Sequence, residues 1–473
     1  MKRDLSLAVT LRVIAILFIA ELPLSASGQT LPPNPPPNPR PPANRGLVIV
    51  TPRRFEAALK PFVEYRRHGL PVEVAILETI LAGSPGADDP EKLKRFLYAA
   101  WQRRNARYVL LVGDATVLPV RYMVLDRVTP AAFDTAFYPS DLYYADVARS
   151  DGSFEDWNGR KDGFHAQYFG EVHGEKNKRD PINFDRVHYV PSLAVGRWPV
   201  SSSDEASTLV NKTIAFERRI SAGPTSRPRL GLVNHEGFVD ARDLLDRMAA
   251  SMPRNWAIAK RYYADARRRS PRPATEQEVV DLLNSGVDLV VHVGHGSDTT
   301  WQGCLSTRDL GKIRNGDHLP VMISAGCSTA RFATLPPYEP YVDVHGVQHK
   351  GTNAGEVFHG PPPPPAAYQT GRFSSIGLGR QLVRAGPDGA VAYYGCNTGG
   401  QPCGITLLEG FVQTWGRSPL PRLGDCWVGA VRYYYDKEKL ATLKPNADWY
   451  PPSIFFQGMK YMLFGDPSLQ LPK

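Results

Sequence analysis

The sequence predicts an α/β protein with a mostly parallel sheet flanked by helices and two subdomains that lie side by side. From residue 47 on, short apolar runs rich in β-branched residues alternate with amphipathic helix-like stretches, which is the order of parallel βαβ units. With 42% hydrophobic and 22% charged residues, the 473-residue chain can build one large or two modest domains. Two apolar runs in the second half each end in a small-residue turn that carries a reactive side chain.

Residues 1–27 have the layout of a secretory signal peptide. Lys2 and Arg3 precede an apolar run at 13–20, and small residues follow it. The run is too short to span a membrane, so we expect no stable membrane anchor. Residues 28–46 form a proline-rich linker of extended, polyproline character. We therefore expect a protein that is secreted or periplasmic once the signal peptide has been removed.

An N-terminal α/β subdomain is expected over residues 47–220. Phe55, Leu59 and Phe62 recur at helical spacing after the first strand, and Gly69 then indicates where that helix stops. The expected strands are 47–51, 72–77, 108–114 and 193–197, and the expected helices begin near residue 53 and span 91–103 and 204–218.

A polar loop within this subdomain is a candidate calcium site. Asp151, Asp156, Asn158 and Asp162 offer oxygen ligands at short spacing, with glycines that allow tight turns. The spacing does not match an EF-hand, and two basic residues within the loop favour an ordinary solvated loop equally. Structural calcium is therefore one of two interpretations.

A catalytic α/β subdomain is expected over residues 221–473. An apolar strand at 289–293 ends in Gly294-His295-Gly296-Ser297, and a second strand at 319–324 ends in Ala325-Gly326-Cys327-Ser328. A polar helix-like stretch at 307–314 separates the two strands, as in a parallel βαβ unit. The further expected elements are a strand at 230–234, regular structure at 376–383 and 389–394, and helices from about 407 and 425.

His295 and Cys327 would then share one edge of the sheet, where reacting groups of open α/β sheets collect. A nucleophilic cysteine needs an imidazole nearby to take its proton and later to pass it to the leaving group. The Gly296 N–H is the candidate oxyanion donor, and the Cys327 amide is a possible second donor. Singly, each motif is more often a plain turn or a core cysteine. Their occurrence together on successive strands favours catalysis.

The chain has five cysteines, all in its second half. An odd number in an exported protein leaves at least one thiol unpaired, and Cys327 is the natural candidate. Cys396 and Cys403 could bridge across an intervening Gly-Gly turn. The spacings do not form a zinc site.

Several motifs resemble the gingipain family of caspase-like cysteine peptidases. They are the stretch 293–301, Val-Gly-His-Gly-Ser-Asp-Thr-Thr-Trp, the strand 108–114, Tyr-Val-Leu-Leu-Val-Gly-Asp, and the terminal Phe-Gly-Asp-Pro-Ser-Leu at 464–469. The resemblance implies a caspase-like fold and a cysteine endopeptidase that acts on proteins or peptides. It also implies that Glu236, which follows the strand at 230–234, assists His295. The chemistry would require no cofactor.

Two other functions remain open. One is a peptidase-like binding protein without activity, and the other is a metal-dependent hydrolase that uses His292, His295 and Asp298. The histidines are three apart on a strand and would point to opposite faces, which makes joint ligation awkward. The net charge of +9 is spread along the chain without a nucleic-acid-binding motif, so we expect no nucleic-acid partner.

Two regions near the expected site have no settled role. Residues 336–368 are irregular and proline-rich, and they are expected to form either a lid or exosite over the active-site edge or a disordered surface loop. Asp240, Asp243 and Asp246 follow Glu236; one of them could line a specificity pocket, or all three could lie on a solvated helix face.

Overall fold

The computed structural model describes residues 46–125, 136–167, 181–223, 226–369, 377–384, 386–446 and 450–473. The predicted signal peptide, 1–27, and all but the last residue of the predicted linker, 28–46, lie outside the described residues. The first strand begins at Gly46, at the end of that linker.

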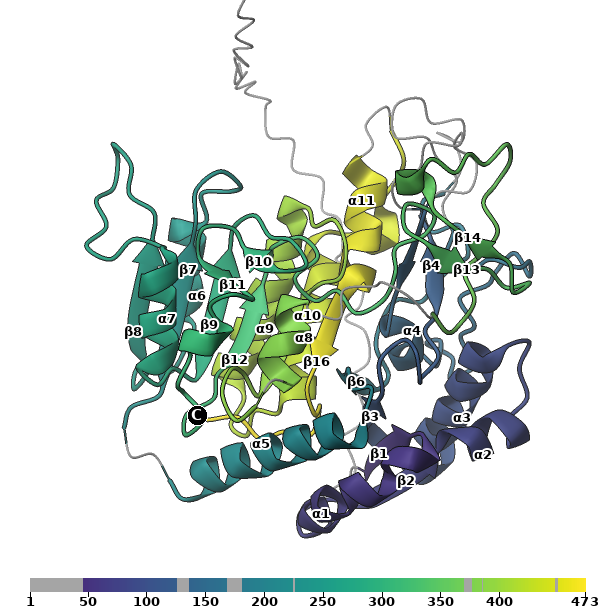
Figure 1. The fold of residues 1–473 in the computed structure, drawn as a ribbon, viewed down its shortest axis with the longest axis horizontal. Coiled ribbons are helices and arrows are strands. Elements are labelled where there is room, and N and C mark those ends of the chain that lie inside the picture. Colours follow the sequence, from purple (N-terminus) through teal and green to yellow (C-terminus); the bar gives the residue numbers. More distant parts are fainter. Residues whose placement is uncertain are drawn as a thin grey trace, which may run out of the picture. The chain divides into compact units, whose positions relative to one another are not determined.

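A ten-stranded sheet organises the described chain (Figure 1). From one side to the other, the strands are β2 (Val72–Ile76), β1 (Gly46–Thr51), β3 (Ala106–Val112), β6 (Ala194–Trp198), β16 (Tyr461–Phe464), β15 (Ala392–Cys396), β12 (Val321–Ser324), β9 (Leu289–Val293), β7 (Arg229–Asn234) and β8 (Ala257–Tyr262). The first four strands come from the predicted N-terminal subdomain and the other six from the catalytic one. The predicted α/β class with a mostly parallel sheet is confirmed.

The two halves of the sheet meet at β16 and run in opposite directions. β16 is antiparallel to β15 and parallel to β6, which it meets through the pair Phe464 and Arg197. The carboxyl ends of β7, β9, β12 and β15 therefore lie at the same edge as the amino end of β16. The carboxyl ends of β1, β3 and β6 lie at the opposite edge.

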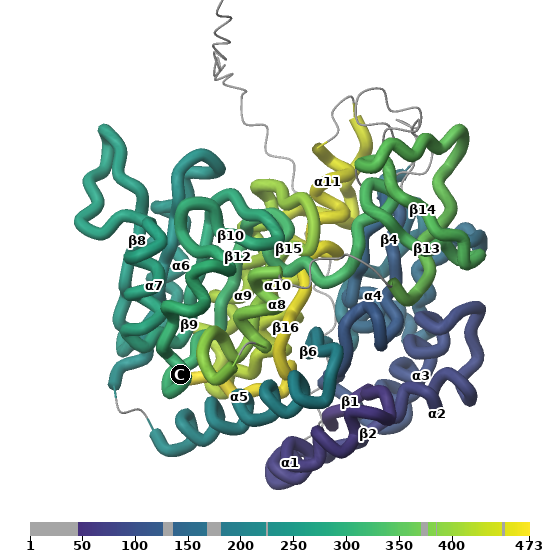
Figure 2. Tube along the Cα trace, in the orientation of Figure 1, coloured from purple at the N-terminus to yellow at the C-terminus, as the bar shows by residue number. Residues whose placement is uncertain are grey.

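Helices cover the sheet, and three short hairpins project from it. The helices are α1 (Glu56–Arg67), α2 (Leu77–Gly83), α3 (Asp89–Arg104), α4 (Leu142–Ala145), α5 (Ser203–Ser221), α6 (Arg242–Ala250), α7 (Glu276–Asn284), α8 (Leu378–Arg384), α9 (Ile405–Arg417), α10 (Leu423–Lys437) and α11 (Tyr450–Gln457). The hairpins are β4 (Tyr122–Val124) with β5 (Phe137–Pro139), β10 (Thr300–Trp301) with β11 (Leu305–Ser306), and β13 (Tyr341–Val342) with β14 (Gln348–His349). The long helix α5 joins the two halves, since it packs on α1 and on α8 (Figure 2).

The central strands are buried on both faces, which explains their continuous apolar sequence. Val290 and Met322 belong to one apolar cluster with residues of α7 and α8. Val291 and Ile323 belong to the other, with residues of α6 and α9. Successive strand residues point to opposite faces of the sheet, so the side chains of these strands pack into the two apolar clusters. The residues that follow the strands are the ones that form the edge.

Several helices begin at residues whose side chains cap them. Asp88, Ser202 and Thr275 accept hydrogen bonds from backbone N–H groups in the first turns of α3, α5 and α7. Asn105 ends α3 in a left-handed conformation with φ of 55°. No helix among these residues has the length and apolar character to cross a bilayer.

The prediction of a helix at 307–314 is wrong. The connection from β9 to β12 holds the β10–β11 hairpin and a single 3-10 turn, Leu310–Lys312. The Asp309 side chain accepts from both the N–H and the hydroxyl of Ser306, which closes a local turn that competes with an α-helix.

The insertion at 336–368 contains the β13–β14 hairpin, which corrects the expectation of a disordered loop. His349 on β14 lies 2.7 Å from a carboxylate oxygen of Glu356 and 3.1 Å from one of Asp343. It also stacks on Tyr341, with ring centroids 4.6 Å apart. These polar contacts and this ring stacking hold the segment in an ordered conformation.

Candidate active site

The predicted catalytic residues follow three adjacent parallel strands at matching positions. Val233 on β7 pairs in register with His292 on β9, and His292 pairs with Ser324 on β12. Three residues beyond these partners stand Glu236, His295 and Cys327. They therefore leave the sheet at the same level of the same edge.

His295 is half-buried and has one defined hydrogen-bond partner. Its Nε2 lies 2.9 Å from the carbonyl oxygen of Gly237. A carbonyl oxygen only accepts, so Nε2 carries the hydrogen and Nδ1 of the neutral ring keeps a lone pair that can take a proton. Phe238 packs beside the ring, with centroids 5.3 Å apart. The loop after β7 thus fixes both the tautomer and the position of the imidazole.

Glu236 lies on this same loop with an exposed side chain. The backbone carbonyl of the following residue, Gly237, is what contacts His295 here. Buried Asn234 shapes the loop, because its Nδ2 donates to the carbonyl oxygens of Val239 and Val293 and its Oδ1 accepts from Ala241 N–H. The predicted support of His295 by the Glu236 carboxylate stays a prediction.

Cys327 is half-buried in a turn that is tied to the segment after β15. Its Sγ lies 3.3 Å from Gly400 N, which can donate to it, and 3.7 Å from Gly400 O, to which the thiol can donate. The next residue, Ser328, has a left-handed φ of 57°, and its N–H donates to Thr398 O at 2.8 Å. A non-glycine residue rarely adopts this conformation, so the contacts of the turn hold it there.

Gly296 brings the histidine and cysteine turns together. A Cβ at this position would lie 2.7 Å from Thr329 Cγ2, 2.9 Å from Cys327 O and 3.0 Å from Gly326 Cα. Only glycine allows this approach. The Gly296–Trp301 bridge is closed by its neighbours, with Ser297 N donating to Thr300 O and Gln302 N to His295 O. Neither of these two hydrogen bonds uses the Gly296 N–H.

His292 braces the strands beneath the site. Its Nδ1 lies 2.9 Å from Ser324 Oγ, which also accepts from Gly326 N–H at 3.0 Å. The ring stacks on Trp301 at 4.3 Å and 3°, and the Trp301 Nε1–H donates to Tyr393 OH. Burial lowers the pKa of His292 to about 3, so the ring is neutral at physiological pH.

The three residues of the metal-hydrolase alternative have separate partners. Fully buried His292 is held by Ser324 and Trp301, and His295 by Gly237. Asp298 lies 3.9 Å from an Arg331 nitrogen. Across the ranges that the structure describes, no cluster of three or more His, Cys, Asp or Glu side chains is arranged to hold a metal.

All five cysteines are free, so the suggested Cys396–Cys403 bridge is not formed. Burial raises the pKa of the Cys304 thiol and of the Cys396 thiol to about 12, and it also raises the pKa values of Cys403 and Cys426. Cys327 differs from these four in its exposure, because the others are buried.

The polar loop proposed for calcium is held by its own contacts. Asp151 accepts from Ser153, and the carboxylate of Asp156 pairs with Lys161. Asn158 donates to the carbonyl oxygen of Asp162. A side-chain oxygen of each of these four residues also accepts from a backbone N–H within the loop. Calcium binding stays a prediction.

The three acids after Glu236 pair with basic residues. Asp240 accepts from Arg242, while Asp243 and Asp246 both pair with Arg268. This supports the view that they form a charged surface, and it leaves the residue that sets substrate preference unassigned.

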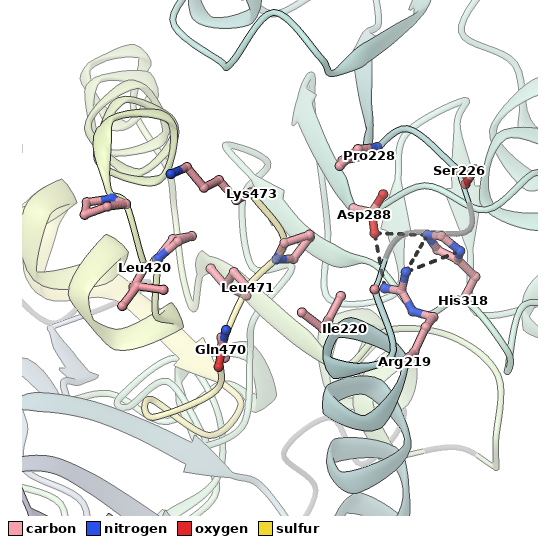
Figure 3. Close-up of a pocket in the computed structure, with 14 residues that line it drawn as sticks. Arg219, Ile220, Ser226, Pro228, Asp288, His318, Leu420, Gln470, Leu471 and Lys473 are labelled. Carbon is pink, nitrogen blue, oxygen red and sulfur yellow. Dashed lines mark hydrogen bonds and ion pairs between the residues drawn. The ribbon is translucent and has the colours of Figure 1, made fainter. Parts of the chain in front are cut away.

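A pocket lies away from these residues, at the opposite edge of the sheet (Figure 3). Asp288, just before β9, accepts from Arg219 at 3.1 Å and lies 3.0 Å from His318 Nε2. Apolar side chains, among them Ile220 and Leu420, complete the lining. Arg219 and Asp288 neutralise each other, so the cluster ties α5 to the sheet.

Comparisons with known proteins agree with this arrangement. The model of Peptidase family C25 matches residues 40–359 of the 473. The chain is a member of this family of gingipain-type cysteine peptidases. Gingipain R2 of Porphyromonas gingivalis is 22% identical over 302 residues, which cover 62% of this chain and 33% of that protein. An uncharacterized protein of Archaeoglobus fulgidus is 26% identical over 250 residues, which cover 48% of each chain.

The fold is also shared with a solved structure. The crystal structure of the Arg-specific cysteine proteinase gingipain R superposes with a TM-score of 0.57 at 17% identity, covering 90% of this chain and 78% of that one. At this identity the likeness concerns the fold. The chain spans about a third of the length of gingipain R2.

Sequence reasoning missed Asn234, Ser324 and Gly400, which hold the loops of the site. Asn234 and Ser324 are polar residues at the ends of buried strands, a signal that was present in the sequence. Gly400 has no such signal, because its contact with Cys327 depends on how β15 and β12 pair.

Proposed function

We propose that the protein is a cysteine endopeptidase that hydrolyses peptide bonds through Cys327 and His295. The observation that carries the proposal is the shared register that brings Glu236, His295 and Cys327 to one sheet edge in a family C25 chain. Cys327 is also the one half-exposed cysteine of the five, which supports its role as the nucleophile. Protein or peptide substrates follow from this assignment.

The reaction proceeds through an acyl-enzyme. His295 takes the thiol proton at Nδ1, and Sγ of Cys327 bonds to the scissile carbonyl carbon. The Gly296 N–H, which its own hairpin leaves outside the bridge hydrogen bonds, donates to the developing oxyanion. The C–N bond then breaks as His295 returns the proton to the amine, which leaves a thioester.

Water completes the cycle. His295 takes a proton from the attacking water, whose oxygen bonds to the thioester carbonyl carbon. The C–S bond breaks, the carboxylic acid product leaves, and the thiol is restored with the proton from the imidazole. Glu236, exposed on the loop whose backbone holds the ring, would stabilise the imidazolium form through its charge. The Gly237 carbonyl keeps the ring oriented throughout.

The test compares the wild-type protein with Cys327→Ala and His295→Ala on a library of fluorogenic peptides. Both variants should lose turnover while their thermal melting stays close to that of the wild type, because both side chains are half-exposed. Iodoacetamide labelling with peptide mass mapping supplies an internal control, since the four buried cysteines should react slowly. Peptidase activity retained by Cys327→Ala would disprove the mechanism.

Export is the second part of the proposal. The basic and apolar pattern of residues 1–27 supports a protein that is released outside the cytoplasm. Expression of the full chain in a bacterium followed by N-terminal sequencing should find a mature protein that begins at residue 28. An intact Met1 on all of the folded protein would contradict it.

A further inference from the structure

Lys460 is a buried lysine that contacts the segment next to the candidate nucleophile. It ends the 3-10 helix Gly458–Lys460, directly before β16, and is 7% exposed. Its Nζ donates to the carbonyl oxygen of Gly399 at 3.4 Å. Its backbone is fixed at the same place, because Asn397 N–H donates to the Lys460 carbonyl oxygen at 2.9 Å. The ammonium group is therefore held against the segment that follows β15.

This segment connects the lysine to the sulfur. Gly399 accepts from Lys460, and the next residue, Gly400, meets Cys327 through both its N–H and its carbonyl oxygen. The two contacts suit different protonation states. A thiol can donate to the carbonyl oxygen, whereas a thiolate can only accept, and for it the N–H at 3.3 Å is the favourable contact. Whatever fixes Gly399 and Gly400 therefore also sets the stability of the thiolate.

Thiols and an aromatic ring surround the Lys460 ammonium group. Burial lowers the pKa of Lys460, and the opposing influences come from the thiols of Cys396, Cys403 and Cys327. Its Nζ also lies 5.5 Å from the ring centroid of Tyr138. Cys396 and Cys403 are buried, and burial raises their pKa values, whereas Cys327 is half-exposed.

We propose that Lys460 is a positioning residue for the Cys327 nucleophile, which fixes the Gly399–Gly400 segment and favours the thiolate through its buried positive charge. The proposal rests on the proposed cysteine peptidase function and deepens it. Loss of the thiol proton to His295 leaves a thiolate at Cys327 that faces the N–H of Gly400. The Lys460 ammonium group donates to the preceding residue, Gly399. A charge in a low-dielectric interior acts more strongly than one in water.

The experiment measures the rate of iodoacetamide alkylation of Cys327 against pH, by peptide mass mapping of the folded full-length chain. Lys460→Met removes the charge, and Lys460→Arg keeps it. The matched control is Lys212→Met, since Lys212 is also buried at 5% exposure and donates to two carbonyl oxygens, those of Leu382 and Asp388. Thermal melting of each variant shows whether it is folded.

Lys460→Met should move the midpoint of the alkylation profile upward by about one pH unit. The rate below both midpoints should fall about three- to fivefold, because a tenfold loss of thiolate is partly offset by the higher nucleophilicity of a more basic sulfur. Lys460→Arg and Lys212→Met should keep the wild-type midpoint. An unchanged midpoint in folded Lys460→Met, or an equal shift in Lys212→Met, would overturn the proposal.

A second variant keeps the proposal testable if the substitutions of Lys460 unfold the chain. In His295→Ala the imidazole is gone, so a midpoint still below about 8.5, the value of an ordinary thiol, is expected from Lys460. A midpoint at or above that value would overturn the proposal. Alkylation does not require turnover, so a wild type that cleaves no peptide but shows these shifts would defeat the peptidase function while the role of Lys460 stands.

Discussion

Adding one methyl group at Gly296 should displace the turns that carry His295 and Cys327. In Gly296→Ala the new Cβ would lie 2.7 Å from Thr329 Cγ2, 2.9 Å from Cys327 O and 3.0 Å from Gly326 Cα. Real Cβ atoms keep contacts beyond these distances, and two of the three atoms belong to backbone that cannot rotate away. Overpacking of this kind costs about 1–3 kcal/mol. For a chain of this size that corresponds to a fall in melting temperature of about 1–3 °C.

The functional effect should be much larger than the thermal one. Relief of the clash pushes the His295 turn away from the Cys327 turn, and a misplacement of about 1 Å can cost about 100-fold in rate. The assays are differential scanning calorimetry and the rate of Cys327 alkylation at neutral pH, with peptide hydrolysis once a substrate is known. Thr329→Ser combined with Gly296→Ala should restore the rate only in part, because the backbone contacts remain.

Gly311→Ala is the matched control for this substitution. Gly311 lies in the same connection between β9 and β12, but a Cβ there would meet nothing within 4 Å. Its melting temperature and alkylation rate should equal those of the wild type. If Gly296→Ala behaved like Gly311→Ala, the two turns would not be held together at this point, and the geometric basis of the site would be refuted.

Two further predictions concern the strands beneath the site and the insertion. Ser324→Ala leaves His292 Nδ1 and Gly326 N–H unsatisfied and should cost about 2–4 kcal/mol in denaturant unfolding; a loss under about 0.5 kcal/mol would show that this hydroxyl does not brace the turn. Burial lowers the pKa of His349, but hydrogen bonds to the Glu356 and Asp343 carboxylates outweigh it and raise the pKa above its usual value. The positive charge of His349 therefore stabilises the hairpin fully below about pH 6.5, and this stabilisation is lost as pH rises through the raised pKa. Limited proteolysis of the β13–β14 hairpin should become faster over that pH range. His349→Gln should remove this pH-dependent increase in the proteolysis rate.

The central strands could be predicted because their sequences are apolar over their whole length. β9 and β12 were found within one or two residues, since buried parallel strands need apolar side chains on both faces. The connection at 307–314 could not be predicted in the same way. Its polar residues fit a helix face, and the competing turn depends on Asp309 folding back on Ser306.

The candidate residues of the site could be named from the sequence, but the contacts that hold them in place could not. His295 and Cys327 stand after strong strand signals, so their shared edge follows from parallel pairing. The predicted support by Glu236 stays a prediction, and the atom that contacts His295 is the neighbouring Gly237 carbonyl oxygen, a backbone group that has no residue-specific signal. The contact between Gly400 and Cys327 joins positions 73 residues apart along the chain.

The α/β class, the order of the central strands along the chain and the candidate residues for the chemistry could all be inferred from the sequence alone, because each depends on local patterns of apolar, small and reactive residues. The sequence gives no sign that the two halves of the sheet run in opposite directions and meet at β16, a feature seen first in the folded chain. That reversal brings the amino end of β16, and with it Lys460, to the edge where Cys327 lies. Its physical reason is strand pairing between distant segments, which no local pattern of residues records.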